Sequence, residues 1–378
     1  MNKELKDLLY LDNNASSFLD PLVRKELLSL YTKPWANPSS LHRFGQEARS
    51  LLALSRKEIA QVLDLPSKDL IFTSGATEAM NMLLLGSVKE PGHIISSNVE
   101  HSAVEKSLQI LEKRGHEVTR LQAGTYGAVR QEQVQEAIKE NTKLITLMAV
   151  NNETGVKTDI EAIASLAEEN DIPFIVDAVA LFSKEPFSLP KGVKGFCLSG
   201  HKFHAPTGVG LAYVHPSLKI QALINGGGQE KQKRSGSENL LGIRAMALAM
   251  QIAEENIHES MAHMLSLRDS FEKSLMKELK GVSINGEGPR VCNTSNLYFE
   301  GVSGEELLFA LDREGLCASH GSACSSGGLQ PSRVLIEMGL GQERALSSLR
   351  FSFSKMNTHE ELQESVQKIV ACCQSLTS

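Results

Sequence analysis

The sequence predicts an α/β protein with a large N-terminal domain, built on a mostly parallel central sheet, and a smaller C-terminal α+β domain. Helical and strand patterns alternate over the first two-thirds of the 378 residues, as the crossover connections of a parallel sheet require. Several predicted strands are apolar runs, typical of strands buried on both faces. The alternation stops near residue 260. We therefore expect the large domain over residues 10–259, and the small domain over 260–378 together with 1–9.

The elements of the large domain are predicted in chain order from periodicity and composition. Good helix formers with helical spacing predict a helix over residues 44–63. Short apolar runs bounded by polar residues or glycine predict strands over 70–73, 93–97, 117–121, 143–150, 172–177, 195–198 and 209–214. Helices are expected from Gly75 onward and over 103–114, 134–139, 160–170 and 240–257.

The small domain is predicted from a long helix, two strands and two capping boxes. The helix is expected over residues 261–279, and the strands over 292–299 and 349–353. The boxes Ser303-Gly-Glu-Glu306 and Thr358-His-Glu-Glu361 each begin a helix, since the first hydroxyl and the last carboxylate bind reciprocal backbone N–H groups.

Charge and cysteine usage exclude several classes of protein. The net charge of −6 argues against nucleic acid as the main partner, because phosphate binding needs clustered positive charge. The charged N-terminus is unlike a secretory signal, and no apolar run is long enough to span a membrane. We expect a cytoplasmic protein. None of the six cysteines forms a C-x-x-C pair, so no metal site is expected. Cys372 and Cys373 are adjacent in the terminal helix, so only one should face the core.

The first candidate site residues follow the strand over 70–73. There Gly75, Ala76 and Thr77 begin a helix, whose free N–H groups and positive dipole end suit a phosphate group. The Thr77 hydroxyl adds a donor. The alternative is that this glycine-containing segment is only a turn.

More polar side chains follow the other strands and are expected at the same sheet edge. Asp177 ends a buried strand, where a carboxylate needs a cationic partner. Lys202 is a candidate for Schiff-base chemistry, although the two residues taken by themselves favour a structural ion pair. Together the residues fit pyridoxal phosphate, with Lys202 bound to it, Asp177 on the ring nitrogen, His101 over the ring, and the segment at Gly75 with Ser199 around the phosphate.

Ten motifs in one order carry a resemblance to a known family. They are Leu11-Asp-Asn-Asn-Ala15, Asn37-Pro-Ser-Ser40, Gly75-Ala-Thr-Glu78, Glu100-His101, Asn151-Asn-Glu153, Asp177, Ser199-Gly-His-Lys202, Gly226-Gly-Gly-Gln229, Arg234-Ser-Gly236 and Ser319-His-Gly-Ser-Ala-Cys324. Nearly the whole chain thus resembles the NifS/IscS-like cysteine desulfurases of the class V aminotransferases. The resemblance implies a fold-type I pyridoxal-phosphate enzyme, a homodimer with its active site at the subunit interface.

The resemblance also implies a role for each site residue. Lys202 carries the cofactor, Asp177 contacts the ring nitrogen and His101 stacks on the ring. The phosphate is bound by Thr77, Ser199, His201 and, from the partner subunit, Ser237. Asn13, Asn152 and Arg350 contact the substrate, Asn152 also the cofactor, and Cys324 is the nucleophile. Without the family, Arg350 would be interpreted as a strand arginine paired with an acid, and Cys324 as an inert loop cysteine.

The implied reaction converts L-cysteine to L-alanine, leaves a persulfide on Cys324 and passes the sulfur to an acceptor or scaffold protein for iron–sulfur cluster or thio-cofactor assembly. One alternative is a selenocysteine lyase. Another is a non-catalytic or low-activity paralogue acting as a binding partner, because Ala180 stands where the family usually has glutamine. No G-x-G-x-x-G follows the first strand, which argues against a nucleotide-binding oxidoreductase.

Overall fold

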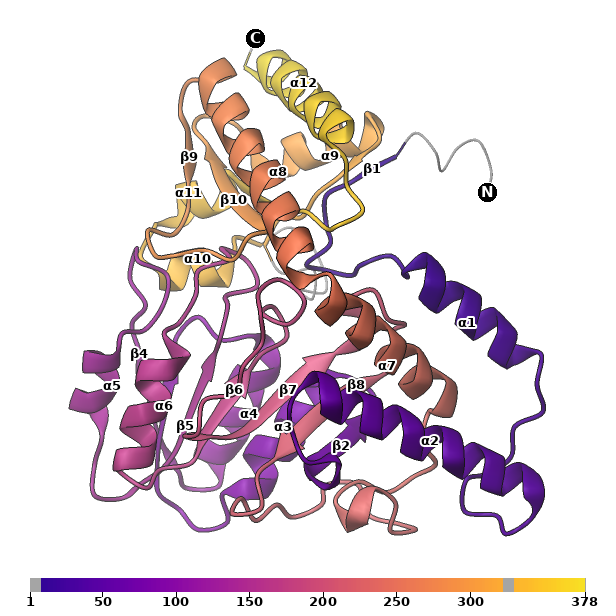
Figure 1. The fold of residues 1–378 in the computed structure, drawn as a ribbon. Helices are drawn as coiled ribbons and strands as arrows, with labels where there is room; N and C mark the ends of the chain where they lie inside the picture. Colours follow the sequence, from indigo (N-terminus) through magenta and orange to yellow (C-terminus); the bar gives the residue numbers. More distant parts are fainter. Residues whose placement is uncertain (1–7, 322–329, 378) are drawn as a thin grey trace.

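The computed structural model describes residues 8–321 and 330–377 of the chain. Figure 1 shows a broad body built around a large sheet, with the C-terminal elements packed as a second group against one end of it. The long helix pair α7 (Leu240–Glu255) and α8 (Ile257–Glu278) runs from one group to the other. The division at residues 259 and 260 stays a prediction.

The large sheet has seven strands in the order β2-β8-β7-β6-β5-β3-β4. All neighbours are parallel except the two pairs that involve β8, which confirms the predicted mostly parallel α/β architecture. The strands are β2 (Leu70–Thr73), β3 (His93–Ser97), β4 (Glu117–Leu121), β5 (Thr142–Met148), β6 (Phe174–Asp177), β7 (Val193–Ser199) and β8 (Gly210–Val214).

Helices cover both faces of this sheet because its apolar strands bury side chains on both sides. Consecutive residues point to opposite faces, so Phe72 and Val176 pack into one apolar cluster, whereas Ile71 and Ile175 pack into another. The first cluster is covered by α2 (Arg43–Val62), α5 (Gln131–Ala137), α6 (Ile160–Glu169) and α7, and the second by α3 (Ala76–Ser87) and α4 (Ser102–Lys113).

The C-terminal group is built on a three-stranded antiparallel sheet in the order β12-β10-β9. Its members are β9 (Val282–Ile284), β10 (Thr294–Phe299) and β12 (Ser348–Ser352), with α8, α9 (Gly304–Arg313) and α12 (His359–Leu376) against them. Both predicted capping residues begin their helices, since the hydroxyls of Ser303 and Thr358 accept backbone N–H groups three residues on. A parallel pair, β1 (Leu9–Tyr10) with β11 (Leu316–Cys317), brings the start of the described chain here.

Several elements were not predicted. The longest is α1 (Pro21–Tyr31), which the sequence signals through Asp20 and Pro21: the Asp20 carboxylate accepts the Leu22 N–H at 2.9 Å, and proline suits the first helical position. The others are short: β1, β9, β11, α10 (Arg333–Glu337) and α11 (Gln342–Leu346). Elements of two to five residues leave too little periodicity to detect.

One expectation about the cysteines is wrong. Both Cys372 and Cys373 are buried, because α12 is packed against α8 and α9 together and so buries a wide stripe of its surface. Within residues 8–321 and 330–377, no helix is both long enough and apolar enough to cross a membrane.

Candidate active site

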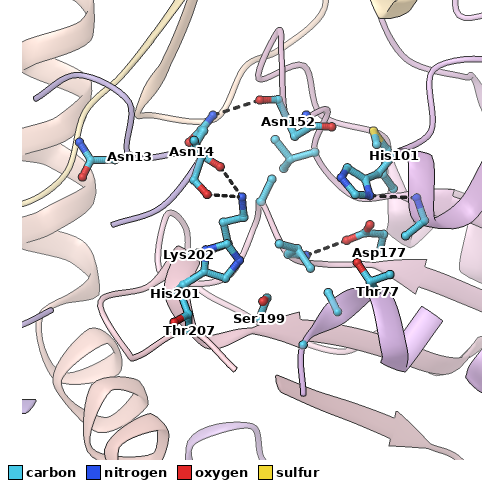
Figure 2. Close-up of a pocket in the computed structure, with 18 of the residues that line it drawn as sticks. Asn13, Asn14, Thr77, His101, Asn152, Asp177, Ser199, His201, Lys202 and Thr207 are labelled. Carbon is cyan, nitrogen blue, oxygen red and sulfur yellow. Dashed lines mark hydrogen bonds between the residues drawn. The ribbon is translucent and has the colours of Figure 1, made fainter. Parts of the chain in front are cut away.

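A cavity of about 360 Å³ lies at the carboxyl ends of the parallel strands, within the size range of small-molecule sites. It gathers most of the predicted site residues from segments far apart in the chain (Figure 2). They are Asn13, Gly75, Ala76, Thr77, His101, Asn152, Asp177, Ser199, His201, Lys202 and Arg350. Ser237 is exposed and does not line the cavity of its own chain. Cys324 lies outside the described residues.

One end of the cavity is an anion cradle formed by the turn from β2 to α3. Gly75 caps α3 without a side-chain hydrogen bond, and the first-turn N–H groups of a helix have no partner inside it. A Cβ at Gly75 would lie 3.6 Å from the Ser199 hydroxyl, and a Cβ at Gly210 would lie 2.5 Å from the Gly75 Cα. The close approach at Gly210 therefore requires glycine there, whereas a side chain at position 75 would meet the Ser199 hydroxyl only at ordinary contact distance. With the Thr77 hydroxyl, this end of the cavity offers donors that suit a phosphate group.

His201 lies beside the cradle, between Ser16 and Lys202. Burial, with a smaller effect of the Lys202 charge, lowers the pKa of its imidazole to about 4. The ring is therefore neutral at pH 7 and contributes a hydrogen bond rather than a charge to the cradle. Thr207, which was not predicted, lines the same part of the cavity.

Asp177 ends β6 at the cavity wall, and its carboxylate is oriented by its own chain. Oδ1 accepts the Val179 N–H at 3.0 Å and the Cys197 thiol at 3.7 Å from the neighbouring strand. Burial, and then the nearby Asp177 charge, raise the pKa of the Cys197 thiol, so this group stays protonated and donates. The chain thus holds one carboxylate oxygen and directs the group toward the cavity (Figure 2).

Lys202 follows β7, and its amine reaches across the cavity to the N-terminal segment. Nζ donates to the carbonyl oxygens of Asn14 at 2.5 Å and of Ala15 at 2.9 Å (Figure 2). The Lys202 carbonyl in turn accepts a hydrogen bond from the Lys184 amine at 3.1 Å. Lys184 was not predicted, although it lies only two residues after the apolar run of residues 178–182. Burial lowers the pKa of Lys184 to about 8.

His101 caps α4 and lines the cavity together with Asp177. Its Nδ1 accepts the Ala103 N–H at 3.1 Å, which assigns the proton of the neutral ring to Nε2. Burial lowers the pKa of His101; the Lys202 and Arg333 charges act in the same direction, and Asp177 opposes them. The structure thus presents a neutral imidazole with a donor at Nε2.

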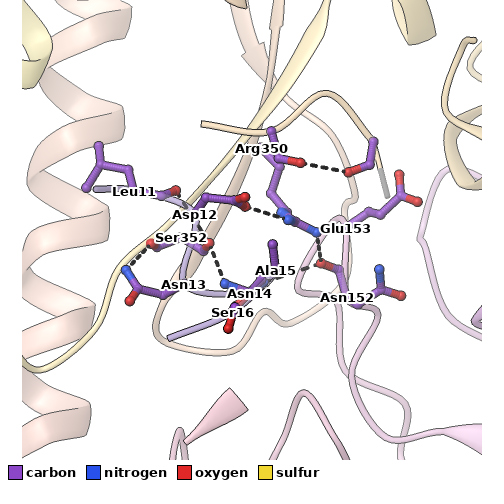
Figure 3. Close-up of polar contacts among 12 residues, drawn as sticks. Leu11, Asp12, Asn13, Asn14, Ala15, Ser16, Asn152, Glu153, Arg350 and Ser352 are labelled. Carbon is purple, nitrogen blue, oxygen red and sulfur yellow. Dashed lines mark hydrogen bonds and ion pairs between the residues drawn. The ribbon is translucent and has the colours of Figure 1, made fainter. Parts of the chain in front are cut away.

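Arg350 lines the far end of the cavity from β12. Its guanidinium is buried, and it donates to the Asp12 carboxylate at 2.7 Å and to the Asn152 carbonyl at 3.0 Å (Figure 3). Arg350 is therefore paired with an acid, as a strand arginine is expected to be, and the pair lies in the wall of the cavity. Within the described residues, Arg350 Nε has no hydrogen-bond partner. Asn13 is fixed nearby through a 2.9 Å bond from its amide to the Ser352 carbonyl.

Glu100 is buried behind the site, next to His101 in the chain. Oε1 accepts the Ser97 hydroxyl at 2.6 Å and the Met148 N–H at 3.1 Å, whereas Oε2 has no partner in the described part of the chain. Burial raises the pKa of the Glu100 carboxyl from 4.5 to about 8. The group is therefore protonated at neutral pH and places no second negative charge beside Asp177.

Replacing Glu100 with glutamine should make stability less dependent on pH. Between about pH 4.5 and 8 the unfolded chain ionises at Glu100 and the folded chain does not, so the wild-type fold loses up to about 1.4 kcal/mol per pH unit relative to Glu100→Gln. Thermal unfolding of both proteins is followed at a series of pH values. The unfolding temperature of the variant minus that of wild type should rise between about pH 4.5 and 8 and stay constant above about pH 8. A constant difference would mean that Glu100 is ionised in the fold.

The arrangement of these side chains defines a class of protein. A lysine amine, an oriented carboxylate and a phosphate cradle in one cavity of a mostly parallel α/β fold are the layout of enzymes that use pyridoxal phosphate. The donor set fits that group, because the cavity offers one partner each for an aldehyde, a ring nitrogen and a phosphate.

Known proteins agree with this class. The model of the family "Aminotransferase class-V" matches residues 9–364. Cysteine desulfurase IscS of Methanosarcina thermophila is 37% identical over 374 residues, which cover 97% of this chain and 92% of that protein. Cysteine desulfurase IscS of Clostridium botulinum is 36% identical over 370 residues, with 96% and 92% covered.

Solved structures give the same result. A NifS-like protein superposes with a TM-score of 0.90 at 33% identity and covers 98% of this chain and 100% of its own. A NifS-like protein from Rickettsia africae superposes with a TM-score of 0.87 at 30% identity, covering 97% and 99%. The chain belongs to the class V aminotransferase family and, within it, to the NifS- and IscS-like cysteine desulfurases.

Proposed function

We propose that this protein is a pyridoxal-phosphate-dependent cysteine desulfurase that converts L-cysteine to L-alanine and passes the sulfur on for iron–sulfur cluster or thio-cofactor assembly. One observation carries the proposal: the Lys202 amine, the Asp177 carboxylate and the anion cradle at Gly75 line one cavity, which Arg350 bounds at the other end. The relatives named as cysteine desulfurases support it.

The cofactor would be held at three points. Gly75, Ala76, Thr77, Ser199 and His201 would bind its phosphate, together with Ser237 of the second subunit. Asp177 would pair with the ring nitrogen, His101 would lie over the ring, Asn152 would contact it, and Lys202 would bind it covalently. When bound, pyridoxal phosphate supplies an electron sink for the substrate carbon. Ala180 lines the same cavity and offers no hydrogen bond.

The chain's own residues would bind the substrate and move its protons. Arg350 would bind the carboxylate of L-cysteine, because a guanidinium matches a carboxylate in a bidentate geometry, with Asn13 and Asn152 beside it. Lys202 would take the proton from the α-carbon. His101 would direct its Nε2–H toward the substrate sulfur as a hydrogen-bond donor, because the cap contact with Ala103 occupies Nδ1.

Cys324 would be the nucleophile. Its thiolate would form a bond to the substrate sulfur while the carbon–sulfur bond breaks and leaves its electron pair on carbon. That carbon then takes up a proton and Lys202 returns the proton to the α-carbon, which together give alanine, and Cys324 holds a persulfide for the acceptor protein. A cytoplasmic location belongs to this proposal, since a reducing compartment keeps the thiol free, and cell fractionation checks it.

A homodimer is the proposed assembly. Large apolar side chains are exposed on α1 and on the segments beside it: Phe18, Leu22, Leu28, Tyr31 and Leu41, the last 82% exposed. Exposed apolar side chains concentrated in one stretch of the chain suit contact with a second copy of the chain. The mass in solution, measured by light scattering, should be twice 41.2 kDa. A monomer mass at working concentrations would contradict the dimer and the placement of Ser237 at a neighbouring site.

The proposed reaction is tested by its products. Purified protein with L-cysteine and a thiol reductant should release alanine and sulfide in equal amounts. Selenocysteine in a parallel reaction separates the closest alternative, because a selenocysteine lyase would form alanine from selenocysteine only. A non-catalytic paralogue, the alternative raised by Ala180, would form alanine from neither.

A further inference from the structure

The cradle proposed to bind phosphate contains a negatively charged side chain. Glu78 is in the first turn of α3 and lines the cavity with Gly75 and Thr77. Its Oε2 accepts the Ser74 N–H at 2.9 Å, which ties the turn 74–77 to the helix. A carboxylate at a helix N-terminus stabilises the helix, but it repels an anion bound at the same N-terminus.

Arg234 is the counter-charge. Its Nε donates to Glu78 Oε1 at 2.7 Å and its Nη2 to Oε2 at 3.3 Å, and the two side chains are only 20% and 16% exposed. Burial alone would raise the pKa of Glu78, but the hydrogen bonds from Arg234 and Ser74 outweigh it and hold the pKa below 4.5. The carboxylate is therefore ionised at neutral pH.

The segment that carries Arg234 is fixed by a buried acid. Glu230 forms an ion pair with Arg56, and its Oε2 accepts the Phe72 N–H of edge strand β2 at 2.9 Å. Glu230, Lys231 and Gln232 have φ angles of 45°, 58° and 63°, a left-handed conformation that non-glycine residues adopt at a cost. Several contacts thus hold a strained turn directly before Arg234, so its position is built into the fold.

We propose that Arg234 is a positioning residue whose ion pair with Glu78 compensates the negative charge in the cradle, so that a phosphate group binds at the start of α3 while Glu78 keeps the turn in shape. The inference rests on the proposed function, because the phosphate is that of pyridoxal phosphate. Arg234 acts through Glu78 and does not line the cavity itself. Glu78 shapes the turn and Arg234 balances its charge, so the two side chains together add no net charge to the cradle.

A charge-balance experiment tests this role on the full chain after removal of bound cofactor. The probes are inorganic phosphate and pyridoxal phosphate, with binding measured by calorimetry. Arg234→Gln leaves the Glu78 charge uncompensated and should weaken both probes at least about tenfold. Glu78→Gln keeps an acceptor for Ser74 and should bind at least as tightly as wild type. The double variant should return to within about threefold of wild type. Arg43→Gln, which breaks the exposed pair with Glu47, is the matched control and should change nothing.

Two results would overturn the inference. One is unchanged affinity in Arg234→Gln, and the other is a double variant as weak as that single variant, which would make Arg234 an anion ligand in its own right. If Arg234→Gln does not fold, Glu78→Gln still decides, because weaker binding there contradicts charge compensation. Failure of the proposed function has a different signature: wild-type protein would bind neither probe.

Discussion

Lys202→Ala should lose at least about a thousandfold in the rate of alanine formation while the fold stays intact. The amine is held in the cavity by the Asn14 and Ala15 carbonyls, whereas the amine of Lys184, which also lines the cavity, is bound to the Lys202 carbonyl. Loss of Lys202 removes both the covalent attachment point of the cofactor and the base for the α-proton. The rate of alanine formation from L-cysteine and the midpoint of thermal unfolding are the measurements.

The matched control for that variant is Lys194→Ala. Lys194 lies on β7, the strand that leads to Lys202, and pairs with Glu168 at the surface. Its loss should leave the rate within about twofold, because an exposed ion pair contributes little. An unimpaired Lys202→Ala enzyme would remove Lys202 from the mechanism.

Cys324→Ser should abolish sulfur transfer from L-cysteine and leave cofactor binding at the wild-type level. A serine hydroxyl is far less nucleophilic than a thiolate and cannot form a persulfide, whereas the residues proposed to hold the cofactor are unaffected. Sulfide release and the absorbance of the bound cofactor report these two properties separately. Cys317→Ser, at a half-buried thiol in β11, should keep full activity. Sulfide released at the full rate by Cys324→Ser would show that another group takes the sulfur.

The position of the site could be predicted because local patterns determine it. The apolar runs that form β3, β5, β6 and β7 end in polar residues, and the carboxyl ends of parallel strands share one edge. His101, Asp177 and Ser199 line the cavity at that edge for this reason. Asp20 and Pro21 are likewise a local signal for the start of α1.

What the sequence leaves open is the pairing between distant segments. Asp12 and Arg350 are 338 residues apart, and Glu78 and Arg234 are 156 apart, so no periodicity links either pair. The same holds for the Lys184 contact to the Lys202 carbonyl, which depends on how the chain turns after β6. Burial of both Cys372 and Cys373 likewise depends on the packing of α12 against two helices at once.

The visible absorbance spectrum of the purified protein, recorded before and after addition of L-cysteine with alanine assayed in the same tube, tests the central claim most directly. We predict a yellow protein whose cofactor band changes when L-cysteine is added and which releases alanine, since Lys202, Asp177 and Arg350 line one cavity. A colourless protein that takes up no pyridoxal phosphate, or a yellow one that forms no alanine from L-cysteine, would contradict it.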